Sequence, residues 1–192
     1  GQPGATQPLT PVPLAEQQRA MRLLRDRVFA PGAFGATPAL LAHLQPQRRG
    51  FGFFGTTEDP KIHARVLNAQ RSVLEHLLHP TTLSRMTDSR AYGGGYSVAL
   101  MVGDLTDAIF AADAKGDVNT FRQNLQVEYV NRLAAMITGE SRLRYDYVAR
   151  SAAVANLRSI QAQVSRPVGN AETRAHRAHL KLVADRALAV PG

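Results

Sequence analysis

The side chains best suited to hold a metal in this chain are two pairs of histidines, but their spacing does not fit a catalytic zinc site. Such a site on a helix needs His-Glu-x-x-His, so that two imidazoles bind the ion and the glutamate activates water. Here Glu75 and His76 precede His79, and His176 precedes His179, both pairs three residues apart. Neither pair places a general base correctly. We interpret these histidines as surface or capping residues and predict no catalytic or metal-ligating residue in this chain.

Other residues with catalytic potential also lack the surroundings that their chemistry needs. Residues 92–96, Tyr-Gly-Gly-Gly-Tyr, form a glycine-rich stretch without the Lys-Ser or Lys-Thr that reaches phosphate and magnesium in a phosphate-binding loop. We interpret them as a tight turn between helices. Ser84, Ser89 and Ser97 stand outside any Gly-x-Ser-x-Gly elbow. The chain by itself is therefore predicted to be catalytically inactive and to carry no cofactor.

The composition describes a basic chain of 192 residues whose hydrophobic fraction of 44% suffices for a sizeable core. Its 23 lysines and arginines exceed its 15 acids, giving a net charge of +8, and the arginines are scattered singly. Scattered arginines indicate a solvated surface, and aromatic residues make up only 6%, so nucleic-acid binding is disfavoured. The absence of cysteine excludes disulfides. No apolar run reaches the length of a membrane span.

Proline and glycine divide the N-terminal part of the chain. Residues 1–12 are rich in proline, glycine and threonine and are predicted to be a flexible linker that lacks the features of a secretory signal. Apolar spacing then predicts a helix over residues 13–29 and a short one over residues 37–44. We expect residues 13–192 to form a single helical domain.

The loop over residues 45–57 is the predicted docking element of this domain. Its glycines oppose a stable helix, and it carries two arginines and three phenylalanines, namely Arg48, Arg49, Phe51, Phe53 and Phe54. The phenylalanines need burial, either in the core of this domain or against a partner. Both readings stay open, and the second makes these five residues a possible interface.

Helical periodicity continues to the end of the chain, and no alternating strand pattern of useful length occurs. Apolar stripes, caps and breakers predict a helix from Asp59-Pro60 to the break at His79-Pro80, and further helices over residues 80–87, 97–112, 119–137, 145–164 and 170–188. The predicted fold is all-α, an irregular bundle of about six to eight helices.

One arginine is predicted to be buried in an ion pair. Arg122 falls beside the apolar stripe formed by Leu125 and Tyr129, so its guanidinium needs a carboxylate. Asp104 or Asp107 on the preceding helix is the nearest candidate in the sequence. We expect a structural pair here, without a part in chemistry.

Several of these helical segments resemble the helical C-terminal region of EcxA-like bacterial zinc-dependent metallopeptidases. The resemblance spans most of the chain, from residues 17–24 through the region from His79 to Leu133, with Phe121 to Gln126 inside it, to residues 151–157. In that family the region packs against a metzincin-like catalytic domain whose motif, His-Glu-x-x-His-x-x-Gly-x-x-His, is absent here. The resemblance therefore transfers no catalytic or zinc-ligating residue to this chain.

The resemblance implies a function for the whole parent protein and an accessory role for this part. It implies a non-catalytic helical domain that buttresses the catalytic domain of the same polypeptide or shapes its substrate cleft. Zinc is implied for the parent protein, and a periplasmic or secreted bacterial location is implied by the family. Two other classes remain open: a free-standing basic helical module that binds nucleic acid or an acidic protein, and an independent enzyme.

Overall fold

The computed structural model describes residues 60–88, 95–110 and 120–190, and these are folded into helices. Within these ranges there are six α-helices, one 3-10 helix and no strand, so the all-α prediction is confirmed. The predicted linker, the helices over residues 13–29 and 37–44, and the loop with Arg48, Arg49, Phe51, Phe53 and Phe54 lie outside the described residues. Those predictions therefore stay predictions.

The helix boundaries agree closely with the sequence-based ones. The elements in chain order are α3 (Pro60–Leu77), α4 (Pro80–Asp88), α5 (Gly95–Phe110), α6 (Thr120–Ile137), the 3-10 helix η4 (Glu140–Arg144), α7 (Tyr147–Val164) and α8 (Ala171–Leu188). Helix α5 begins two residues before the predicted start, and α7 begins two residues after it. The short helix η4 was not predicted.

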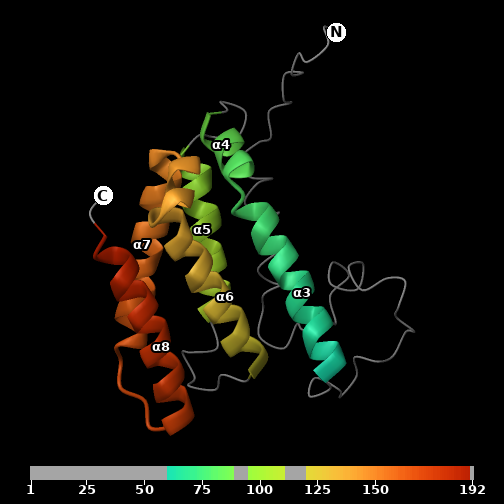
Figure 1. Cartoon of the computed structure of the whole chain (residues 1–192), viewed down its shortest axis with the longest axis vertical. Helices are drawn as coiled ribbons and strands as arrows, with labels where there is room; N and C mark the ends of the chain where they lie inside the picture. Colours follow the sequence, from blue (N-terminus) through green and yellow to red (C-terminus); the bar gives the residue numbers. More distant parts are fainter. Residues whose placement is uncertain (1–59, 89–94, 111–119, 191–192) are drawn as a thin grey trace, which may run out of the picture.

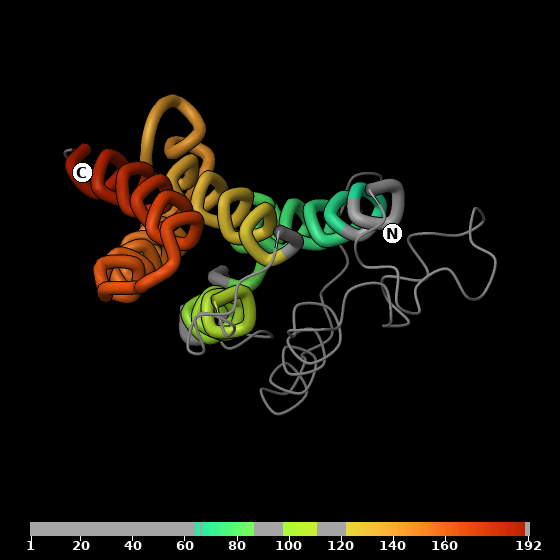
Figure 2. The backbone as a smooth tube through the Cα atoms, turned by 90° about the horizontal axis from the view of Figure 1, so that it is seen from below, coloured from blue at the N-terminus to red at the C-terminus, as the bar shows by residue number. Residues whose placement is uncertain are grey.

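Helices α5, α6, α7 and α8 form a bundle, and α3 packs on its outer side. Figure 1 shows these four helices gathered together, with α4 linking α3 to α5. In the end-on view of Figure 2, α6 lies between α8 and α3, which agrees with the contacts that α6 makes to both. Helix α7 packs extensively against both α5 and α8.

The core brings together apolar side chains from all six helices, among them the predicted stripe of α6. Val98, Val102 and Ile109 of α5 are fully buried, as are Leu125, Tyr129, Leu133 and Met136 of α6. Burial of each such side chain contributes about 1.5–3 kcal/mol. The α3 and α4 helices add Leu74, Leu78 and Leu83, while α7 and α8 add Leu157, Ile160, Leu180 and Ala184.

Side chains and one glycine determine where several helices begin and end. Asp146 accepts a hydrogen bond from the backbone N–H of Ala149, and Asn170 accepts one from Thr173, as N-cap residues do. The Asp146 cap explains why α7 begins at Tyr147. Gly139, two residues after the end of α6, has φ +64°, a backbone conformation that glycine adopts without steric cost, and it redirects the chain into η4.

No helix in the described ranges combines the length and the apolar character needed to cross a lipid bilayer.

Candidate functional site

An open groove of about 640 Å³ lies where α7 meets the ends of α6 and α8. Three arginines line it: Arg142 from η4, and Arg150 and Arg158 from α7. Its apolar part includes Val154 of α7 and Leu188 of α8. The described residues that line the groove include no carboxylate, so the groove concentrates positive charge.

The groove follows one face of α7. Arg150, Val154 and Arg158 are spaced four residues apart, so they succeed one another one turn at a time along the helix. Tyr147, in the first turn of the same helix, also lines the groove and has a side chain that is 76% exposed. An exposed aromatic ring beside guanidinium groups is a surface suited to binding a partner.

Backbone contacts hold the N-terminal end of the groove in place. Arg150 donates from Nη1 to the carbonyl oxygen of Tyr145 at 2.7 Å. The Tyr145 hydroxyl in turn donates to the carbonyl of Leu78, at the end of α3, at 3.0 Å. Partial burial raises the pKa of Tyr145, so the hydroxyl keeps its proton and remains a donor. The segment between η4 and α7 is thereby tied to α3.

A second polar cluster gathers at the end of α5, where side chains from α6 and α7 donate to backbone carbonyls. Arg122 Nη1 lies 3.2 Å from the carbonyl oxygen of Ala108, Gln126 Nε2 lies 3.2 Å from that of Ile109, and Gln163 Nε2 lies 3.3 Å from that of Phe110. The last carbonyls of a helix lack partners within the helix, and a cation there is favourable. These contacts make the cluster structural.

The two contacts of Gln126 extend this cluster to α8. The Nε2 of Gln126 donates to α5, and its Oε1 lies 2.8 Å from Nε2 of His176. Desolvation by burial lowers the pKa of His176 to about 4, with smaller contributions from the neighbouring His179 and Arg177. His176 is therefore a neutral packing residue near pH 7.

A third polar cluster joins α5, α6 and α7 inside the bundle. The Thr106 hydroxyl lies 2.7 Å from both the Tyr129 hydroxyl and Oδ1 of Asn156. Because Oδ1 only accepts, Tyr129 donates to Thr106 and Thr106 donates to Asn156 when both contacts are satisfied. Burial raises the pKa of Tyr129, so this hydroxyl stays protonated. It is a fixed hydrogen-bond donor rather than a base.

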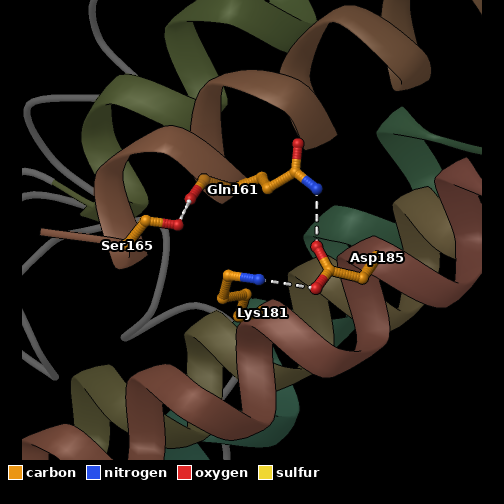
Figure 3. A network of polar contacts seen from close by, with 4 residues as sticks. All are labelled: Gln161, Ser165, Lys181 and Asp185. Atoms are coloured by element: carbon orange, nitrogen blue, oxygen red, sulfur yellow. Dashed lines mark hydrogen bonds and ion pairs between the residues drawn. The ribbon is translucent and has the colours of Figure 1, made fainter.

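The outer faces of α7 and α8 are joined by a polar network (Figure 3). Gln161 of α7 donates to Oδ1 of Asp185, and Lys181 reaches Oδ2 of the same carboxylate at 2.7 Å. Ser165 donates to the backbone carbonyl of Gln161 at 2.7 Å. The hydrogen bond from Lys181, followed by that from Gln161, lowers the pKa of Asp185. Exposed contacts of this kind contribute little to stability.

Arg122 is buried, with 1% of its surface exposed, as the position beside the apolar stripe predicted. Its Nη1 contacts the carbonyl oxygens of Ala108 and Ile109 on α5, and on that helix Asp104 is half-buried and Asp107 exposed. Its pairing with Asp104 or Asp107 stays a prediction. Glu128 and Arg132, four residues apart on α6, form an ion pair in which Arg132 Nη2 lies 3.0 Å from the carboxylate.

A family model described as Met-zincin matches residues 1–117, more than half of the chain. The chain belongs to the Met-zincin family. No curated protein and no solved structure matches it. Within the matched part of this Met-zincin chain, the described elements are α3, α4 and α5, whereas α6 to α8 lie beyond it.

The Met-zincin family implies zinc, but the described residues of this chain do not fit a zinc site. Among them no three or more His, Cys, Asp or Glu side chains are grouped so as to hold a metal. Nδ1 of His79 accepts the backbone N–H of Thr81 at 3.1 Å, which makes it the predicted capping histidine of α4. His176 contacts Gln126 instead of a second histidine. We therefore derive no zinc-dependent step from these residues.

Sequence reasoning missed the groove of the Met-zincin chain, although part of its signal was visible. The four-residue spacing of Arg150, Val154 and Arg158 defines a mixed basic and apolar stripe on one helix. The groove residues from α6, η4 and α8 are brought to α7 by the packing of the helices, and the periodicity of a single helix does not reveal that packing.

Proposed function

We propose that this chain is the non-catalytic helical portion of a zinc-dependent metallopeptidase of the EcxA-like type, placed C-terminal to the catalytic domain. Its role is to buttress that domain or to shape its substrate cleft. The observation that carries the proposal is a Met-zincin match over residues 1–117 in a chain whose sequence contains no His-Glu-x-x-His. We further propose a bacterial origin and a periplasmic or secreted location, in keeping with the resemblance.

The rigid helical bundle supports an accessory role. Its buried polar groups hold helices together instead of facing a cleft: Arg122 and Gln126 of α6 bind carbonyls of α5, and Thr106 of α5 contacts Tyr129 of α6 and Asn156 of α7. Such a bundle provides a stable surface against which a second domain can pack.

The test begins with the reading frame upstream of this chain and continues with the separated parts. We expect a continuous upstream frame that encodes His-Glu-x-x-His. The isolated chain should hydrolyse neither casein nor peptides and should contain no stoichiometric zinc. Adding it to the separately expressed catalytic domain should raise the melting temperature of that domain. An upstream frame without the zinc motif, or peptide hydrolysis abolished by substitutions within this chain, would contradict the proposal.

The loop with Arg48, Arg49, Phe51, Phe53 and Phe54 is the proposed contact to the catalytic domain. The double variant Phe51→Ser with Phe54→Ser separates the two readings of this loop. An interface loop predicts an unchanged melting temperature and weaker association, whereas core residues predict unfolding, because each buried ring contributes about 3–5 kcal/mol. A destabilised variant with unchanged association would refute docking through this loop.

A further inference from the structure

We propose that the groove along α7 binds an acidic peptide segment in extended conformation. The segment carries one apolar side chain with one carboxylate on each side of it. The carboxylates would pair with Arg150 and Arg158, and the apolar side chain would contact Val154 between them. This proposal does not depend on the parent protein being a peptidase, and its test uses the 192-residue chain alone.

The charge of the groove selects an anionic partner. Three guanidinium groups line it, and none of the described lining residues is acidic. Ile137 and Leu188 are the last residues of α6 and α8, so each helix end brings about half a negative charge to the groove. Three full positive charges exceed these two partial ones, and the groove stays positive.

The spacing along α7 selects an extended peptide. Arg150 and Arg158 are eight residues apart, which at 1.5 Å per residue separates them by about 12 Å along the helix. Extended chain advances about 3.3 Å per residue, so side chains four residues apart are separated by about 13 Å. Side chains at the first, third and fifth positions of such a segment share one face. The fitting pattern is therefore acid-x-apolar-x-acid.

The apolar lining favours a peptide over a nucleic acid. Around Val154 the groove is aliphatic, with Ile137, Leu188 and Val190 from the ends of α6 and α8. Single-stranded nucleic acids bind through successive aromatic stacking platforms, and Tyr147 is the one aromatic side chain among the described lining residues. An aliphatic side chain between two carboxylates matches the lining better than stacked bases do.

The experiment measures fluorescence anisotropy of a labelled peptide, Glu-Ser-Leu-Ser-Glu, titrated with the full chain. A peptide of the same composition, Glu-Leu-Ser-Ser-Glu, turns the leucine to the opposite face and should bind more weakly by about threefold or more. The lysine analogue, Lys-Ser-Leu-Ser-Lys, should not bind. Added salt should weaken binding of the first peptide, because the contacts are charged and exposed.

Two matched charge reversals locate the binding surface. Arg158→Glu changes an exposed groove arginine and should weaken binding by about tenfold or more, whereas Arg65→Glu changes an exposed arginine on α3 and should alter it by less than about twofold. Thermal melts establish that both variants are folded. An equal loss of peptide affinity in the two variants, or no binding of the acidic peptide, would overturn the proposal. The proposal would also be overturned if an oligothymidylate bound more tightly than the peptide and Arg158→Glu abolished that binding.

Discussion

Nε2 of His176 on α8 lies 2.8 Å from Oε1 of Gln126 on α6, and this contact determines which nitrogen of the neutral histidine ring carries the hydrogen. Gln126 uses its Nε2 to donate to the carbonyl of Ile109, so its Oε1 is an acceptor. The hydrogen therefore belongs to Nε2 of His176. A neutral ring with this tautomer connects α8 through α6 to the end of α5.

We predict that the protein loses stability as the pH falls from about 6.5 to about 4. The pKa of His176 is lowered to about 4 in the folded protein, so over this range the unfolded chain binds the proton more readily. The contribution of His176 is complete above pH 6.5 and lost as the pH falls to 4. Because the ring is partly exposed, we expect about 1–2 kcal/mol instead of the full value of the shift. Urea unfolding at several pH values measures it.

Two histidine variants isolate this effect from the titration of carboxylates in the same range. His176→Gln cannot titrate but keeps an amide donor for Gln126, and it should flatten the pH dependence. His76→Gln removes an exposed histidine on α3 and should leave the dependence as in the parent protein. Identical profiles for all three proteins would show that His176 does not couple to folding.

Arg122→Ala should destabilise the protein by about 3–5 kcal/mol. The substitution removes a buried guanidinium from the carbonyls of Ala108 and Ile109, together with the apolar stem of the side chain. Arg132→Ala, which removes a partly exposed pair with Glu128 on the same helix, should cost less than about 1 kcal/mol. Chemical denaturation compares the two. Similar small losses would show that the burial of Arg122 contributes little.

The predicted pairing of Arg122 with a carboxylate of α5 is tested by a double-mutant cycle. Arg122→Met is combined with Asp104→Asn, and separately with Asp107→Asn. A coupling energy above about 1 kcal/mol would identify the partner. We expect coupling to the half-buried Asp104 and none to the exposed Asp107. Coupling near zero in both cycles would remove the ion pair and leave only the backbone contacts.

Tyr129→Phe should cost about 1–2 kcal/mol, because it removes a buried hydroxyl that donates to Thr106 and lies 3.0 Å from the carbonyl oxygen of Val102. Tyr145→Phe removes a hydroxyl that contacts the carbonyl of Leu78 in a partly buried position, and it should cost less than about 1 kcal/mol. Thermal melts of the two variants compare these losses of stability. A larger loss of stability for Tyr145→Phe would mean that the hydroxyl of Tyr129 contributes less than the hydroxyl of Tyr145.

Periodicity along one helix is a property of the sequence, and the helices and their buried faces were predictable for that reason. The stripe of Leu125, Tyr129 and Leu133 lies in the core as its spacing indicates. The burial of Arg122 followed from the same spacing. The N-cap of α8, Asn170, is likewise a local signal, because an asparagine placed before a helical pattern is visible in the sequence.

The groove and the polar clusters depend on contacts between distant segments, which local patterns do not contain. Gln163 and Phe110 are 53 residues apart, and Thr106 and Asn156 are 50 apart. Helix η4 was missed because its five residues are too few to show a period. Its placement of Arg142 beside α7 was therefore not predictable either.

The donors at the end of α5 have a consequence for where this protein can be divided. The Met-zincin match ends at residue 117, but Arg122, Gln126 and Gln163, which bind the carbonyls of α5, all follow that position. Val98, Val102 and Ile109 are likewise fully buried in a core that α6 and α7 share. A fragment that ended at residue 117 would expose this apolar face to solvent, and the carbonyls at the end of α5 would lose their protein donors. The folding unit of this protein therefore extends beyond the residues that match the family.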